Sequence, residues 1–359
     1  MASVGRPIRL TTPLAPNRPA RALARLPGRR VPLLARLALV LAALAGGLYA
    51  QLPPPQPASG PGGSDYNFAS FQVHGPFPPT SYYLFTPSPA PAAAPVALVL
   101  PGAGFGSPQQ YFGLIGHLAR KGYSVAWVPW ISLDPGSWIS WNYATNAGAV
   151  WSDALTRLEG IVPPLKDGAG RPLTGFIGHS IGGWVAGVMA SRVGLGVTSS
   201  FPMPKAIVGV APSAGFAWPE DMRGVSPETV LVAVLGASDN VGCTRAVEEL
   251  WKAPVPDQRR DILVVHEQTR GAISLRAWHD FPTGWFAPFG GVDSVDYFAV
   301  YKLAEAALDC GVYGTNCGVA VGNGAAAQVT MGVWSDGLPV SPMTWAASPA
   351  SVPRIPGCP

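Results

Sequence analysis

The segment Leu173–Gly187, LTGFIGHSIGGWVAG, decides the fold that the sequence predicts. Its first residues form a short apolar run typical of a buried strand, and small and apolar residues continue after Gly182 at helical spacing. Ser180 stands at the turn between them, where Gly178 and Gly182, which lack a Cβ, allow strand and helix to close tightly around it. A G-x-S-x-G pattern in this setting predicts a nucleophile elbow. The alternative interpretation is a serine that caps the helix.

Apolar runs and amphipathic stretches alternate on both sides of this elbow. Continuous apolar runs such as Val96–Leu100 are typical of strands buried on both faces, and the strand–helix–strand order implies parallel strands with right-handed crossovers. The strands are expected at Phe68–Val73, Ser81–Thr86, Val96–Leu100, Tyr123–Val128, Leu173–Ile177, Lys205–Val210, Thr229–Leu235 and Asp261–His266. The helices are expected at Pro108–Lys121, Asn146–Val162, from the elbow to Arg192, Cys243–Lys252 and Val295–Leu308. The sequence therefore predicts an α/β fold with a doubly wound, mostly parallel eight-stranded sheet, wrapped irregularly by the last residues of the chain.

The amino end reads as a targeting segment that precedes the fold. Residues 1–50 combine an arginine-rich, acid-free leader with the apolar run Leu37–Ala50, which is shorter than the ~20 residues that span a bilayer. We expect a signal peptide cleaved near Ala50 and an exported protein. A transit peptide to an organelle lumen such as the plastid, and an uncleaved membrane anchor, are alternatives. The Pro/Gly-rich residues 51–64 predict a linker, and residues 65–359 a single α/β domain.

The charge distribution argues against a nucleic-acid partner. The whole chain carries a formal charge of +4, but residues 1–64 hold eight arginines and no Asp, Glu or Lys. The remaining residues hold 16 basic and 20 acidic side chains, a net charge of −4. No basic patch is left that would predict nucleic-acid binding.

Four cysteines lie in the C-terminal third of the chain. In an exported protein an even number of cysteines indicates disulfides, and four cysteines allow three pairings. The favoured pairing is Cys310–Cys317, which closes a short loop, with Cys243–Cys358 tethering the tail. We expect no metal, because the chain has no close CxxC pair and no histidine beside a cysteine, and no organic cofactor is implied.

Candidate reacting groups follow three of the expected strands. Reacting groups in open α/β sheets gather at the carboxyl ends of the strands. Ser180 follows the elbow strand, Asp239 lies in the loop after Thr229–Leu235, and His279 lies farther downstream. A serine needs a neutral imidazole to take its proton, and a carboxylate to orient that imidazole. The order Ser180, Asp239, His279 therefore predicts a nucleophile, an acid and a base, with Asp280 expected as a solvated or structural carboxylate.

The other four histidines fit the role of base less well. His74 lies in the N-terminal hairpin, and His117 is expected on a surface helix. His179 is too close to Ser180 in sequence to face it. His266, at the end of a strand, stays open as an alternative base.

Two backbone N–H groups are expected to form an oxyanion hole. One belongs to Ile181, the residue after the serine, and the other to the glycine-rich loop after Val96–Leu100, where we favour Ala103 with Gly104 as the alternative. This loop, PGAGFG, lacks Walker spacing, the lysine and the rest of a dinucleotide fingerprint, so it does not indicate phosphate binding.

Tryptophans cluster around these positions. We expect Trp130, Trp184 and Trp278 to line a pocket for a bulky apolar ester, and plain core packing is the alternative. The others that cluster there are Trp127, Trp138, Trp141, Trp151 and Trp285, together with Phe286.

The elbow, the strand before the glycine-rich loop and the Ser–Asp–His order resemble the α/β-hydrolase superfamily over roughly residues 65–310. The stretch from Leu100 to Trp130, LPGAGFGSPQQYFGLIGHLARKGYSVAWVPW, is similar to chlorophyllases, dienelactone-hydrolase-like proteins and bacterial polyester hydrolases. Ile181 departs from the arginine of the GHSRGG motif often seen in chlorophyllases, which argues against a chlorophyll-specific enzyme. The resemblance implies carboxylic-ester hydrolysis but does not fix the substrate. We expect a serine esterase that acts on a small-molecule or lipid-like ester. Pigment-ester hydrolysis, acyl transfer and a non-catalytic binding protein are the alternatives.

Overall fold

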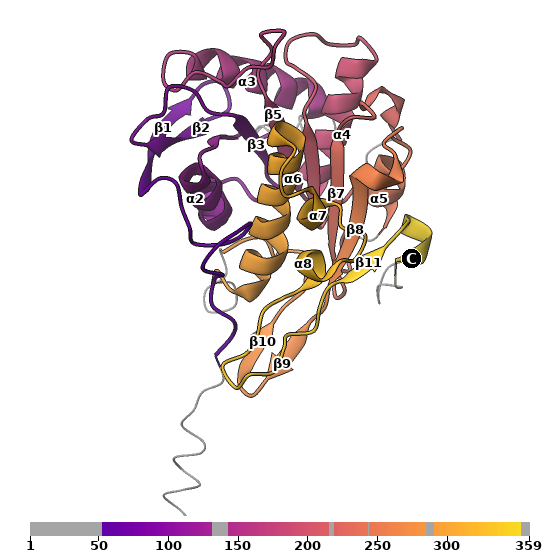
Figure 1. Cartoon of the computed structure of the whole chain (residues 1–359). Helices are drawn as coiled ribbons and strands as arrows, with labels where there is room; N and C mark the ends of the chain where they lie inside the picture. Colours follow the sequence, from indigo (N-terminus) through magenta and orange to yellow (C-terminus); the bar gives the residue numbers. More distant parts are fainter. Residues whose placement is uncertain (1–51, 131–142, 215–218, 243, 285–290, 353–359) are drawn as a thin grey trace, which may run out of the picture. The chain divides into compact units, whose positions relative to one another are not determined.

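The computed structural model describes residues 52–130, 143–214, 219–242, 244–284 and 291–352 (Figure 1). All of them belong to one compact unit, Ala50–Pro359. The targeting segment predicted at residues 1–50 and the predicted pair Cys243–Cys358 lie outside the described residues. None of the helices in these ranges combines the length and the apolarity that a bilayer crossing requires.

A mostly parallel sheet of nine strands forms the centre of this unit, in the order β1-β2-β4-β3-β5-β6-β7-β8-β11 (Figure 1). The strands are β1 (Ser70–Phe77), β2 (Tyr82–Ser88), β3 (Val96–Leu100), β4 (Ser124–Trp127), β5 (Thr174–His179), β6 (Ala206–Val210), β7 (Val230–Gly236), β8 (Arg260–Val265) and β11 (Thr344–Ala346). The pairs from β4 to β8 are parallel, whereas β1, β2 and β11 pair antiparallel. The α/β fold is therefore confirmed.

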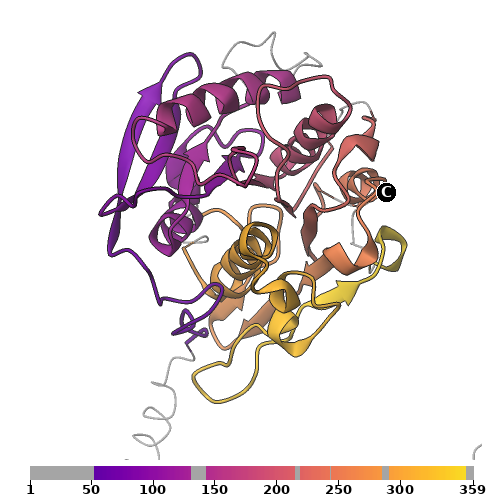
Figure 2. The ribbon, with the colours of Figure 1, turned by 45° about the horizontal axis from the view of Figure 1, so that its top comes forward.

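Helices cover both faces of the sheet. Figure 2 shows α3 and α4 on one face and α2 and α6 on the other. The α-helices are α2 (Phe112–Lys121), α3 (Tyr143–Leu158), α4 (Ile181–Gly194), α5 (Arg245–Leu250), α6 (Lys302–Tyr313), α7 (Cys317–Ala320) and α8 (Ala326–Val329). A π-helical turn, Asp296–Tyr301, precedes α6. Short 3-10 turns lie at Pro108–Tyr111, Met222–Gly224, Asp257–Arg259 and Pro349–Ser351.

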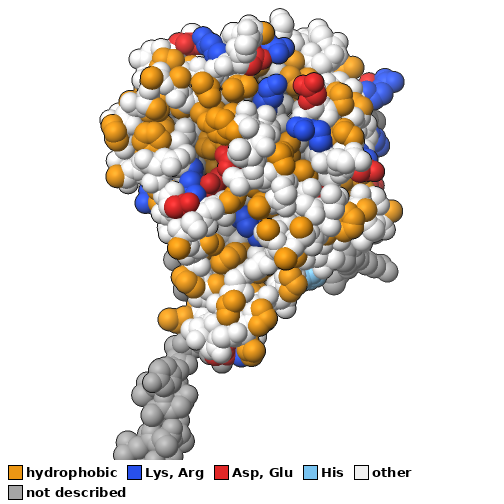
Figure 3. Space-filling model, in the orientation of Figure 1, with side chains coloured by type: hydrophobic (Ala, Val, Ile, Leu, Met, Phe, Trp, Pro, Cys, Tyr) orange, Lys and Arg blue, Asp and Glu red, His pale blue; other side chains and the backbone are white. Residues whose placement is uncertain are grey.

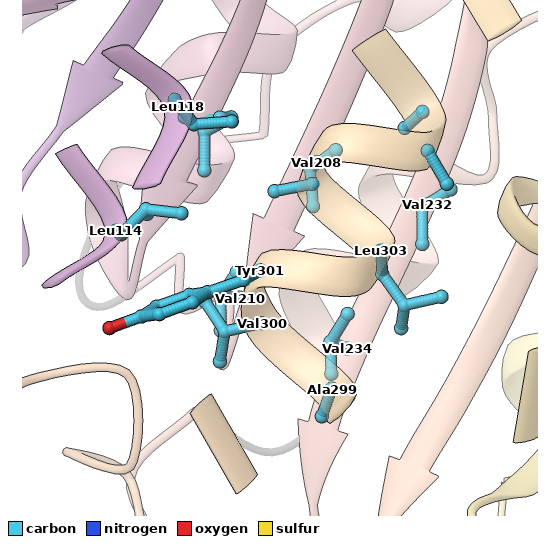
Figure 4. Packing of buried hydrophobic residues seen from close by; sticks show 14 of the residues in the cluster. Leu114, Leu118, Val208, Val210, Val232, Val234, Ala299, Val300, Tyr301 and Leu303 are labelled. Carbon is cyan, nitrogen blue, oxygen red and sulfur yellow. The ribbon is translucent and has the colours of Figure 1, made fainter. Parts of the chain in front are cut away.

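The core lies between these layers because strands β3 to β7 are buried along their whole length. Such strands present apolar side chains to both faces, which explains their continuous apolar sequences. Figure 4 shows Val300 of the π-helical turn and Leu303 of α6 in one cluster with Val208, Val232 and Val234 of β6 and β7. Figure 3 shows acidic and basic side chains dispersed over one face of the molecule.

The C-terminal region differs from the prediction. The sheet has nine strands where eight were predicted, because Thr344–Ala346 pairs antiparallel with β8. A separate hairpin, β9 (Gln268–Arg270) with β10 (Ile273–Leu275), also went unpredicted. Segments of three residues are too short to show a period in the sequence. The predicted disulfide Cys310–Cys317 is confirmed, and it joins the end of α6 to the start of α7.

The N-terminal residues expected as a linker lie against the domain over 52–64. Leu52 exchanges hydrogen bonds with Ser335, and the Gly62 N–H donates to Glu305 on α6 at 2.8 Å. Backbone hydrogen bonds, which composition does not reveal, therefore hold this Pro/Gly-rich segment in place.

Candidate functional site

A sharp turn joins β5 to α4, with Ser180 at its apex. Ser180 adopts φ 55° and ψ −128°, a left-handed φ that is uncommon for a non-glycine residue. A Cβ on Gly178 would approach the Gly182 carbonyl oxygen to 2.2 Å, and a Cβ on Gly182 would approach the Leu100 oxygen to 2.4 Å. The glycines therefore allow the helix to begin directly beside the ends of β5 and β3.

The structure brings Ser180, His279 and Asp239 together although they are far apart in sequence. His279 Nε2 lies 2.8 Å from Ser180 Oγ, and His279 Nδ1 lies 2.9 Å from Asp239 Oδ2. Because an ionised carboxylate can only accept, Nδ1 carries the proton and Nε2 turns a lone pair toward the hydroxyl. This arrangement allows the imidazole to accept the serine proton.

Asp239 is held as an anion in the loop after β7. The residue is fully buried, and its Oδ1 accepts the N–H groups of Val241 and Gly242 at 2.8 Å each. Burial acts to raise the pKa of Asp239, but the hydrogen bond from His279 and these two N–H groups outweigh it, so that the pKa lies below its usual value. The carboxylate therefore stays charged and accepts from the imidazole.

The segment that carries His279 crosses the end of β7. The Ser238 N–H donates to the Ala277 carbonyl at 3.2 Å, and the Phe281 N–H donates to the Trp278 carbonyl at 3.2 Å. These bonds hold His279 between the loop of Asp239 and the turn of Ser180.

Two candidate oxyanion donors flank the serine. Ile181 is the first residue of α4, so its N–H belongs to the group that has no acceptor inside the helix. The Gly102 N–H donates to the Tyr111 hydroxyl at 3.0 Å and is therefore engaged. Ala103 comes next and is exposed, and Gly104 follows it with φ +81°. Ala103 and Gly104 remain the candidates for the second donor.

The three tryptophans predicted to line a pocket lie in different surroundings. Trp184 is buried between α4 and α5, where its indole N–H donates to Glu249 at 2.6 Å, so its placement fits the core-packing alternative. Trp130 is also buried, and its N–H donates to the Pro101 carbonyl. Trp278 is 44% exposed beside His279. Trp138, Trp141, Trp285 and Phe286 lie outside the described residues.

The remaining histidines lie away from Ser180 or face elsewhere. His74 contacts Thr86, and His266 contacts Thr344 at 2.7 Å. His117 was expected on a surface helix, but it is buried, because α6 packs over α2 and brings Glu305 to it.

Sequence reasoning missed the role of two buried residues beside the site. His179 does not face Ser180, but its two ring nitrogens contact the Tyr111 hydroxyl and the His279 carbonyl oxygen. The histidine directly before Ser180 was a usable signal, whereas nothing in the sequence around Tyr111 indicates this contact.

Among the described residues, no group of three or more His, Cys, Asp or Glu side chains is arranged to hold a metal ion. Compared with known protein families and with curated proteins, the chain matches none of them.

Proposed function

We propose that this protein is a serine esterase of the α/β-hydrolase type, which hydrolyses carboxylic esters. The observation that carries the proposal is one imidazole, His279, that contacts a serine hydroxyl at 2.8 Å and a buried carboxylate at 2.9 Å through its opposite nitrogens. The backbone of Ser180 adds to it, because a strained turn between a parallel strand and a helix is the position of the nucleophile in this type of enzyme.

The reaction proceeds in two halves. Ser180 Oγ attacks the ester carbonyl carbon while its proton passes to His279 Nε2, and Asp239 stabilises the imidazolium that forms. The N–H groups of Ile181 and Ala103 bind the oxyanion. His279 then protonates the departing alcohol, leaving an acyl-enzyme. Water attacks the acyl carbon with its proton going to His279, and the acid leaves as Ser180 regains its proton.

Two exposed apolar residues adjoin the reacting groups in sequence and support an apolar ester as the substrate. Trp278 is 44% exposed beside His279, and Val241 is 58% exposed two residues after Asp239. Exposed apolar side chains next to reacting groups suit a small-molecule or lipid-like ester with apolar substituents.

We also propose that the protein works in an oxidising compartment, either secreted or in an organelle lumen. The Cys310–Cys317 disulfide supports this location, because disulfides persist in such compartments and are rare in the cytosol.

The test compares Ser180→Ala with Ser191→Ala on nitrophenyl esters of increasing chain length. Ser191 is a buried serine on the same helix whose hydroxyl contacts the Asp221 carbonyl, so it controls for loss of a buried hydroxyl. We expect Ser180→Ala to abolish turnover and labelling by a fluorophosphonate probe, while Ser191→Ala keeps both. A Ser180→Ala protein that turns over esters at the wild-type rate would refute the proposal. An added alcohol acceptor distinguishes hydrolysis from acyl transfer by the product formed.

A further inference from the structure

A series of hydrogen bonds connects the loop after β3 to the backbone carbonyl of His279. The Gly102 N–H donates to the Tyr111 hydroxyl at 3.0 Å, and this hydroxyl lies 2.8 Å from His179 Nδ1. His179 Nε2 in turn lies 2.8 Å from the His279 carbonyl oxygen. Tyr111 and His179 are both buried. The chain thus links the loop after β3, the turn before α2, the elbow and the segment that carries His279.

Each proton in this chain is assigned by its partners. Burial, together with the nearby His279, lowers the pKa of His179 to about 3, so its ring is neutral and carries one N–H. The His279 carbonyl can only accept, so that N–H is on Nε2 and Nδ1 accepts the Tyr111 O–H. The Tyr111 oxygen accepts the Gly102 N–H. All bonds therefore point one way, from Gly102 toward the backbone of His279.

Close packing also restricts the positions of these groups. A Cβ on Gly102 would lie 2.9 Å from both His179 Nδ1 and Ser180 Cβ, so the loop after β3 has no room to shift toward the elbow. The Phe105 ring meets His179 edge-on with centroids 5.0 Å apart, and the His279 ring lies 5.2 Å from the His179 ring. A displacement of His179 would therefore shift both the loop after β3 and the segment that carries His279.

We propose that His179 and Tyr111 are positioning residues, which hold the proposed base and the proposed oxyanion loop at fixed places relative to Ser180. This inference rests on the proposed function. His179 fixes the backbone of His279, and Tyr111 fixes Gly102, the neighbour of Ala103. One hydrogen-bond chain thus sets the two geometries that the reaction needs. Neither residue touches the reacting atoms.

The main test replaces His179 in two separate variants, by glutamine and by asparagine, whose side-chain amides have the same polarity. In His179→Gln the amide nitrogen stands near the place of Nε2 and keeps the donor to the His279 carbonyl. In His179→Asn the amide stands near the place of Nδ1 and keeps only the contact with Tyr111. We expect His179→Asn to lower kcat about 100-fold with KM little changed, since a misplacement of about 1 Å costs on the order of 10²-fold. His179→Gln should retain at least tenfold more kcat than His179→Asn.

Tyr111→Phe tests the other end of the chain, and Tyr123→Phe is its control. Tyr123 is a buried tyrosine between α2 and β4 whose hydroxyl contacts Asp309. We expect Tyr111→Phe to lower kcat about tenfold or more, and Tyr123→Phe to leave kcat unchanged. The rates of the His179, Tyr111 and Tyr123 variants are counted per site labelled by a fluorophosphonate, so that loss of folded protein does not lower them. The rate of Ser180→Ala, which has no site to label, is counted per mole of folded protein.

Two results would overturn the inference. One is equal kcat per labelled site in His179→Gln and His179→Asn, and the other is a Tyr111→Phe protein as active per labelled site as the wild type. Both are read against Ser180→Ala in the same assay. If Ser180→Ala is inactive and the positioning variants keep full rates, the positioning fails and the esterase proposal stands. If Ser180→Ala retains activity, the esterase proposal itself fails.

Discussion

Two histidine–carboxylate pairs lie among the residues that the structure describes, and their contacts are nearly equal in length. His279 Nδ1 lies 2.9 Å from Asp239 beyond the carboxyl end of β7, and His117 Nε2 lies 2.7 Å from Glu305 between α2 and α6. The imidazole of His279 is 15% exposed, whereas that of His117 is 1% exposed. The two pairs also differ at the second ring nitrogen, which meets the Ser180 hydroxyl in one pair and the Tyr66 hydroxyl, at 3.3 Å, in the other.

The carboxylate partners explain the difference. Besides the histidine, Asp239 accepts the backbone N–H groups of Val241 and Gly242. Glu305 also accepts the Gly62 N–H at 2.8 Å and pairs with Lys121 at 3.1 Å. The His117 ring is stacked on Tyr301 with centroids 5.0 Å apart. The Glu305 pair therefore joins α2, α6 and the N-terminal segment. The His279–Asp239 pair is thus the candidate for chemistry, because its second ring nitrogen meets a serine hydroxyl.

The largest difference in kcat between the two pairs is expected when glutamine replaces each histidine in turn. Glutamine keeps a hydrogen-bond donor but cannot take a proton, so His279→Gln should lower kcat for nitrophenyl esters on the order of 10⁵–10⁶-fold. His117→Gln should leave kcat per labelled site within about twofold, because the partners of His117 are Glu305 and Tyr66 and not Ser180. Turnover and fluorophosphonate labelling measure both. A similar loss in the two variants would contradict the assignment of His279 as base.

Neutralising the carboxylates is expected to have the next largest effect. Asp239→Asn should lower kcat about 10⁴-fold, because an amide no longer fixes the imidazole tautomer or stabilises its charge. Glu305→Gln should leave kcat per labelled site unchanged and lower the free energy of unfolding by about 1–3 kcal/mol, because Lys121 loses its buried partner. Steady-state kinetics and denaturant unfolding check the pair. An Asp239→Asn protein with wild-type kcat would argue against the proposed mechanism.

The pH dependence of stability sharpens the comparison for His117. Burial lowers the pKa of His117, and Glu305 only partly opposes this effect, so the folded pKa lies below the unfolded value of 6.5. As the pH falls below 6.5, the unfolded chain binds a proton that the folded chain does not. The free energy of unfolding should therefore fall by up to about 1.4 kcal/mol per pH unit until the folded pKa is reached. His117→Gln should flatten this slope in urea unfolding between pH 7 and 5, and an unchanged slope would exclude His117 as its source.

The smallest effect is expected at Tyr66, which stands at the second nitrogen of His117. Tyr66→Phe removes the 3.3 Å contact with His117 and the 2.8 Å bond from Gln56, while its ring can still pack on Arg120. We expect a loss of about 0.5–1.5 kcal/mol in the free energy of unfolding, with kcat unchanged. A measurable loss of kcat would indicate that this cluster communicates with the site.

The parallel part of the fold could be predicted because each of its strands is a continuous apolar run. Val96–Leu100 was expected with the bounds that β3 has, and the glycines of the elbow predicted its tight turn. Thr344–Ala346 could not be predicted, because only its pairing with β8 makes it a strand. The packing of residues 52–64 escaped prediction for a related reason, since backbone contacts with distant segments hold them.

The prediction of the site residues was limited in the same way. Ser180, Asp239 and His279 could be chosen because each follows an expected strand and their order matched a known chemistry. The burial of His117 could not be seen, because its partner Glu305 lies 188 residues away in the chain. The hydrogen bonds through Tyr111 and His179 could likewise not be predicted. Local pattern reveals which residues could react, and tertiary contact decides what orients them.

The short strand β11 has a consequence for solubility. It covers the backbone edge of β8, a strand buried along most of its length, and the opposite edge strand, β1, contains Pro76, which has no N–H to offer. One border of the sheet is thus a strand of only three residues, and Pro76 interrupts the row of N–H groups at the other. A chain that stopped before Thr344 would leave β8 uncovered and prone to edge-to-edge aggregation.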